Sequence, residues 1–126
     1  MNYEDRVTKE YLENALAGAR VKIATGTYTG NGQASQFIDL GFTPKAVLVL
    51  SFDGRLLVFM GNAHYCYGGL ALTGHPAACN YNNNEVNIVS IVEGGFNVSY
   101  IDAFDPWRYF IMANAAYQVM HYIAIA

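Results

Sequence analysis

The stretch Lys45-Ala-Val-Leu-Val-Leu-Ser-Phe52 is the most strongly β-forming part of the chain, with apolar residues at every position from 46 to 50. Branched aliphatic side chains favour strands, and apolar residues at successive positions are typical of a strand covered on both faces. The pair Asp53-Gly54 follows, and then a second apolar segment, RLLVFM, over 55–60. An Asp-Gly pair between two such segments favours a tight type I′ turn, so we predict a β-hairpin over 45–60.

Strand patterns continue on both sides of this hairpin. Residues 85–92 and 96–101 flank Glu93-Gly94-Gly95 and predict a second hairpin. The last ten residues, YQVMHYIAIA, place apolar or aromatic side chains at alternate positions and predict a final strand. Together with shorter candidate strands, the spacing of turns predicts one antiparallel β-sandwich of about seven or eight strands over residues 21–126.

Two segments lack a clear strand pattern. Residues 61–84 are rich in Gly, Asn, His and Tyr, and predict a long connection with one short strand over 67–72. Residues 102–116 contain the only tryptophan, Trp107, and predict a second connection with a helical turn near 107–114. Loops held by a rigid sheet are where binding residues concentrate, so both segments are candidates for function.

Residues 3–16 predict an amphipathic helix. Tyr3, Val7 and Tyr11 recur at a spacing of four and form one stripe, whereas Glu10 and Glu13 lie on the opposite side. A helix this short is marginal in isolation. We therefore expect the segment 1–20 to serve in oligomerisation or to dock on the body.

The composition restricts the class of protein. Hydrophobic residues make up 53% of the 126 residues and charged residues only 13%, against about 25% charged in an average domain, which excludes a disordered chain. Apolar runs reach at most five residues, against the roughly 20 of a membrane-spanning helix, so no membrane partner is expected. No basic stripe is present, which argues against nucleic acid. The charged N-terminal residues predict synthesis in a bacterial-type cytoplasm without a signal peptide.

The charged residues are unevenly distributed. Eight of the seventeen lie within residues 1–22, which leaves nine for the 104 residues that follow. So few charges are unusual for the surface of a soluble monomer, and we therefore expect a homo-oligomer that buries part of the body between subunits. The alternative is a body solvated by its many Asn, Ser, Thr and Tyr side chains.

The sequence contains no recognisable catalytic motif. It has no G-x-S-x-G segment around a nucleophilic serine, and neither cysteine lies in a catalytic context. His64-x-Cys66 and His75-x₃-Cys79 supply four zinc-type ligands, but their spacing is not that of a structural zinc site. We therefore predict no catalytic residue, no metal and no cofactor, and expect both thiols to be reduced.

The two long connections are rich in aromatic and amide side chains, which are typical of binding surfaces. We predict a ligand-binding surface formed by Tyr65, Tyr67, Tyr81, Asp102, Asp105, Trp107 and Tyr109. The alternative places the aromatic rings in the core or in an oligomer interface. The two aspartates also leave a glycosidase open, but aspartate is common in turns and this interpretation is less favoured.

Three pieces of the sequence carry a resemblance: Ile23-Ala-Thr-Gly-Thr-Tyr-Thr-Gly30, Ile38-Asp-Leu-Gly-Phe-Thr-Pro-Lys-Ala-Val-Leu-Val49, and Asn114-Ala-Ala-Tyr117 with Tyr122-Ile-Ala-Ile125. They resemble the small β-domains of phage and prophage virion proteins, which occur in tail fibres and related receptor-binding regions, notably in prophages of gut Firmicutes. The helix-forming start of the chain also resembles the start of such proteins. The pair Ala115-Ala116 departs from this pattern, because a glycine often precedes the tyrosine of the last strand.

This resemblance implies a non-enzymatic virion component. It implies a β-sandwich that assembles as a homo-oligomer, expected to be a trimer, that contacts other virion proteins and binds a host surface glycan or protein. No ligand-binding residue is carried over by motif. Two alternatives stay open: a purely structural virion part such as a decoration, collar or baseplate piece, and a polysaccharide hydrolase.

Overall fold

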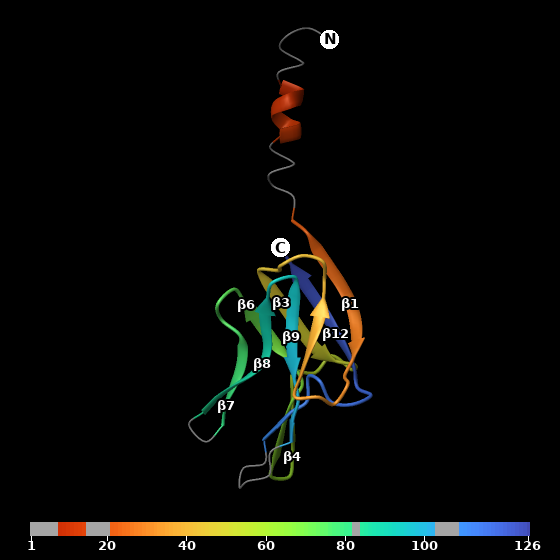
Figure 1. Cartoon of the computed structure of the whole chain (residues 1–126), viewed down its shortest axis with the longest axis vertical. Helices are drawn as coiled ribbons and strands as arrows, with labels where there is room; N and C mark the ends of the chain where they lie inside the picture. The colour runs from red at the N-terminus through yellow and green to blue at the C-terminus, as the bar shows by residue number, and fades with distance from the viewer. Residues whose placement is uncertain (1–7, 15–20, 82–83, 103–108) are drawn as a thin grey trace.

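The computed structural model describes residues 8–14, 21–81, 84–102 and 109–126, and Figure 1 shows a β-rich body that follows a short helix over 8–14. The described residues form twelve strands in three sheets. The strands are β1 (Ile23–Thr29), β2 (Ser35–Asp39), β3 (Ala46–Ser51), β4 (Leu57–Met60), β5 (Ala63–Cys66), β6 (Gly69–Leu72), β7 (Ala77–Tyr81), β8 (Asn84–Val92), β9 (Gly95–Ser99), β10 (Ile101–Asp102), β11 (Tyr109–Ile111) and β12 (Val119–Ile125).

Two of the sheets form the layers of a sandwich. The first sheet has the order β1-β12-β3-β6 and the second has the order β2-β9-β8-β7, and all their pairings are antiparallel. Inward-facing side chains of both sheets form one core. The third sheet, β10-β11-β5-β4, contains a parallel pairing between β11 and β5. Figure 1 shows β4 at the end of the body opposite the C-terminus.

Alternation along the strands divides their side chains between the core and the outer surface. In β3, Val47 and Val49 are buried, whereas Leu48 and Leu50 point to the other face. Tyr28 links the two layers, because its ring packs edge-on against Phe96 at 6.1 Å between centroids. Fully buried core side chains come from both layers: Val47, Val49 and Met120 from the first sheet, and Val89, Phe96 and Val98 from the second.

The predicted all-β, antiparallel sandwich with a short N-terminal helix is confirmed. The helix over 8–14 lies within the predicted 3–16, and the rest of the segment 1–20 lies outside the described residues. The second predicted hairpin is also confirmed, since β8 and β9 pair around a turn in which Gly94 has φ +85°. The predicted final strand is β12, over Val119–Ile125.

The predicted hairpin over 45–60 is wrong in its pairing. A turn forms here, with Gly54 at φ +80° and its N–H donating to the Ser51 carbonyl at 2.9 Å, but it is not the predicted type I′ turn, because Asp53 does not have a positive φ. However, β3 pairs with β12 on one edge and β6 on the other, which leaves no edge for β4. Strand β4 pairs instead with β5 in the third sheet. The turn therefore moves the chain from one sheet to another.

Both predicted connections contain strands, which raises the count above the predicted number. Residues 61–84 contain β5, β6 and β7, where one strand over 67–72 was expected. In the second connection, residues 109–111 form strand β11 within the stretch where a helical turn was expected. These strands are three to five residues long, too short to establish a period of two in the sequence.

Both ends of the body lie together. Lys22 and Ala126 exchange two backbone hydrogen bonds, with N···O distances of 3.2 and 2.8 Å. In the part of the chain that the structure describes, no helix is long and apolar enough to cross a membrane.

A buried asparagine holds two loops together at the opposite end of the first sheet. The Asn114 side chain accepts a hydrogen bond from the Asn31 N–H at 3.2 Å and donates to Asn31 Oδ1 at 2.7 Å and to the Gln33 carbonyl at 2.9 Å. The loops approach closely, because a Cβ atom at Gly30 would lie 2.0 Å from the Ala115 carbonyl oxygen. These contacts fix the segment before β12 against the loop after β1.

We predict that Asn114→Ala lowers the free energy of unfolding by about 2–3 kcal/mol, because it leaves buried polar groups without partners. Urea denaturation measures this change. The control is Asn80→Ala, at an exposed position of β7, which should change stability by less than about 0.5 kcal/mol. Equal losses in both variants would contradict the role of Asn114.

Candidate functional site

The third sheet carries a row of aromatic rings across three strands. Phe59, His64 and Tyr109 are register partners on β4, β5 and β11. The rings of His64 and Tyr109 stack at 4.5 Å between centroids and 10° between planes, and Phe59 packs on His64 at 4.7 Å. The exposed fraction of Phe59 is 61%. The row therefore presents aromatic surface to solvent at this end of the body.

A second aromatic pair lies on the other face of the same sheet. Tyr65 stacks on Phe110 at 4.8 Å between centroids and 10° between planes. Asp102 is the register partner of Phe110 and is exposed. The structure thus brings Tyr65, Tyr109 and Asp102 into one sheet, but it places Tyr109 on the face opposite to the other two.

The other predicted ligand-binding residues are not part of this sheet as described. Tyr67 follows β5 and packs partly against the core. Tyr81 ends β7, and its side chain lies outside the described part of the structure. Asp105 and Trp107 also lie outside the described residues.

A pocket of about 340 Å³ opens at the turn between β3 and β4. Among the predicted residues whose side chains the structure describes, Tyr67 is the one that lines it. Its other residues come from turns and strand ends that carried no binding motif in the sequence, and their convergence depends on the tertiary fold. The lining consists of Ser51, Phe52, Asp53, Arg55, Val58, Met60, Tyr67 and Gln118.

The polar side of this pocket is fixed by its own contacts. The Ser51 hydroxyl donates to Asp53 Oδ1 at 2.5 Å and accepts from the Arg55 N–H at 2.9 Å. Arg55 Nε lies 3.0 Å from Asp53 Oδ2. The Ser51 hydrogen bond and, less strongly, the Arg55 charge hold the pKa of Asp53 below its ordinary value. The carboxylate is therefore ionised at neutral pH and paired with a cation.

The loop beside this pocket holds a strained backbone. Tyr117 has φ +65°, in the left-handed region that a bulky side chain rarely adopts. Its side chain is 91% exposed. Tyr117 immediately precedes the pocket residue Gln118. Backbone strain of this kind persists where the surrounding structure imposes it and is frequent at functional sites.

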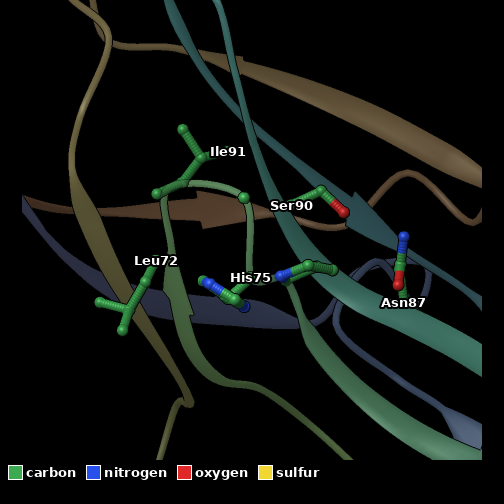
Figure 2. Close-up of a pocket in the computed structure, with 7 residues that line it drawn as sticks. Leu72, His75, Asn87, Ser90 and Ile91 are labelled. Carbon is green, nitrogen blue, oxygen red and sulfur yellow. The ribbon is translucent and has the colours of Figure 1, made fainter.

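A second, smaller pocket of about 180 Å³ lies between the β6–β7 turn and β8. Figure 2 shows Leu72 and His75 from the turn side and Asn87, Ser90 and Ile91 from β8. The turn is closed by two backbone hydrogen bonds of 2.9 Å between Leu72 and His75. This pocket combines one imidazole with an amide and a hydroxyl.

The fold places Cys66 and Cys79 beside each other but does not gather the four zinc-type residues of the sequence at one point. His64 belongs to the aromatic row, His75 is exposed in a turn, and Cys66 and Cys79 lie on β5 and β7. In the described part of the chain, no three His, Cys, Asp or Glu side chains gather as a metal-binding group. Burial, together with the neighbouring Cys79, raises the pKa of the Cys66 thiol to about 11.

The outward face of the first sheet is apolar on β3 and β6 and mostly so on β12, where His121 is the exception, whereas on β1 Ile23 is followed by Thr25, Thr27 and Thr29. None of the residues in these four strands is Asp, Glu, Lys or Arg. Leu70 is 55% exposed, Ile123 42% and Ile125 39%. Two rows cross the face in register: Ile23–Ile125–Ala46–Leu72 and Thr25–Ile123–Leu48–Leu70.

No protein-family model matches the sequence, and comparisons with curated proteins and with solved structures give no significant match.

Because glycine adopts a positive φ without steric cost, Tyr117→Gly should relieve the strain in this loop. We predict that it raises the free energy of unfolding by about 0.5 kcal/mol, after the entropy that glycine adds to the unfolded chain is subtracted. Urea denaturation measures the difference. Ala116→Gly, at the neighbouring exposed position, should instead lower stability, and a gain in both variants would contradict the strain at Tyr117.

The buried Cys66 thiol gives a prediction for alkaline pH. The folded state keeps the thiol proton while the unfolded chain loses it above pH 9.0, so the stability due to this group is complete below pH 9.0 and is lost as the pH rises towards about 11. Over this range the free energy of unfolding of the unmodified protein should fall by about 2 kcal/mol more than that of the Cys66→Ala variant. Tyrosine and lysine titrations cancel in this comparison of urea unfolding curves. If the free energy of unfolding falls by the same amount in both proteins, the raised pKa of Cys66 is wrong.

Proposed function

We propose that the chain is a non-enzymatic component of a phage or prophage virion, a tail-fibre-like module that assembles as a homo-oligomer and binds a glycan or protein on the host surface. The sequence resemblance supplies the virion setting and the expected trimer. The outer face of the first sheet, largely apolar and without Asp, Glu, Lys or Arg, is the observation that carries the proposal.

The size of this face suits an interface between copies of the chain. The four strands lie about 4.8 Å apart and have seven, seven, six and four residues at a rise of about 3.3 Å, which gives a flat footprint of about 380 Å². The largest apolar patches on monomeric proteins measure about 300–600 Å² and are often functional. Further copies of the chain are the simplest cover, because apolar faces arranged around a threefold axis can pack together without charge complementarity.

The arrangement of the ends supports surface binding at the far side of the body. Lys22 and Ala126 are hydrogen-bonded to each other at one end, and Figure 1 shows β4 at the other. A body attached through the segment 1–20 therefore presents the third sheet and the pocket at the β3–β4 turn away from the attachment. Exposed aromatic rings such as Phe59 are suited to recognition there.

The electrostatics of the larger pocket favour binding over hydrolysis. Glycoside hydrolysis uses a carboxylic acid whose pKa is raised, so that it can donate a proton. Asp53, the carboxylate of this pocket, has a pKa below its ordinary value. It is therefore suited to accept hydrogen bonds from a ligand.

We predict that the full chain forms a trimer of about three times 13.9 kDa and that Ile123→Lys dissociates it. A lysine at this central position of the outer face brings an unpaired charge into the interface while leaving the core unchanged. Light scattering on a sizing column measures the mass. Leu70→Lys, in the same row, should act alike, whereas Phe37→Lys, at a similarly exposed position of β2 in the other sheet, should leave the trimer intact. A monomeric unmodified chain would overturn the oligomer.

The same variants test binding to cells. The fluorescently labelled trimer should adsorb to cells of a Firmicutes host, and dissociation into monomers should weaken adsorption by about 100-fold or more because multivalency is lost. A purely structural virion part would instead bind another virion protein and no cells. Absence of adsorption to every strain of a broad Firmicutes panel would therefore favour that alternative.

A further inference from the structure

We propose that the pocket at the β3–β4 turn binds a single ring of a neutral sugar. This assignment names the ligand class of the proposed host-surface binding and rests on that function for its biological role. The binding chemistry itself is argued from the pocket alone.

The pocket has the size and one wall that a sugar ring requires. Its volume of about 340 Å³ lies at the lower end of the roughly 300–1,000 Å³ typical of small-molecule sites, which favours a ligand of about one ring. Phe52, Tyr67 and Val58 supply apolar surface. The faces of aromatic rings carry partial negative charge, and the C–H groups on one face of a pyranose carry partial positive charge, so the two surfaces are complementary.

The polar residues of the described lining carry no net charge together. Asp53 accepts hydrogen bonds, Arg55 donates them, and the Gln118 amide does both. Since Asp53 and Arg55 form an ion pair with each other, no charge is left over to select an anion or a cation. A sugar hydroxyl is both a donor and an acceptor and can satisfy all three groups. This charge balance is the reason for choosing a neutral ligand.

The polar groups are both accessible and preorganised. The Asp53 and Arg55 side chains are 56% and 61% exposed, so a ligand can reach them. Ser51 is only 5% exposed, and its hydroxyl fixes the turn through Asp53 and the Arg55 N–H. A turn that is already held in place loses little conformational entropy when a ligand binds.

Saturation-transfer NMR on the full chain tests the assignment, with glucose, galactose, mannose and N-acetylglucosamine as probes and glucuronate as the anionic comparison. We expect transfer to at least one neutral sugar and weaker transfer to glucuronate. Asp53→Asn and Gln118→Ala should each weaken the apparent affinity about tenfold, the loss expected for one hydrogen bond to a polar ligand. The matched control, Glu93→Gln, removes an exposed carboxylate outside the pocket lining and should bind as the unmodified protein does.

Several outcomes would overturn the assignment: no transfer to any neutral sugar, preference for glucuronate, or equal binding by the pocket variants and the control. If any of these occurs while the trimer still adsorbs to cells, the pocket assignment fails and the host-binding function stands. If neutral sugars bind at the pocket but the protein adsorbs to no cells, the pocket assignment stands and the host-binding function fails. The two proposals therefore fail separately.

Discussion

Strands β3 and β12 are hydrogen-bonded to each other in the middle of the first sheet and carry apolar side chains on both faces. One face, with Val47, Val49 and Met120, is buried in the sandwich. On the other face Leu48 is half-buried and Ile123 is exposed, and Phe52 stacks on His121 towards one end. A strand that is apolar on both faces is stable in water only when both are covered. The core covers one of the two faces, and association between copies would cover the other.

The same central position of β3 determines where the candidate site forms. Because both edges of β3 are occupied, the chain that leaves it after Ser51 enters the third sheet instead of folding back. The turn between the two sheets is therefore left open, with Asp53 and Arg55 at its surface and Tyr67 beneath. On its other side, the Asn114 contacts fix the segment that leads to Gln118. The pocket is in this sense a product of the sheet topology.

These relations explain what the sequence could and could not predict. The β8–β9 hairpin was predictable because its turn glycines and its strand pattern are local. The position of the turn at Asp53-Gly54 was equally predictable, although its type was not. The partner of β3 was not predictable either, because β12 lies about 70 residues away in the sequence and pairs with β3 through nonlocal contacts. For the site, the sequence identified Tyr67 but not Ser51 or Gln118. Serine and glutamine carry no binding signal of their own until the fold brings them together.

Under the proposed function, weak binding in one pocket and association between copies would complement each other. The pocket at the β3–β4 turn is small and open to solvent, and a single ring offers only a few hydrogen bonds, so the affinity of one site for one sugar is expected to be low. Copies held together through the first sheet would present several such pockets to the repeated sugars of a cell surface. Each further contact is then intramolecular and strengthens adhesion without any new chemistry in the pocket. Under the proposed function, firm attachment would therefore require both the association between copies and the pocket.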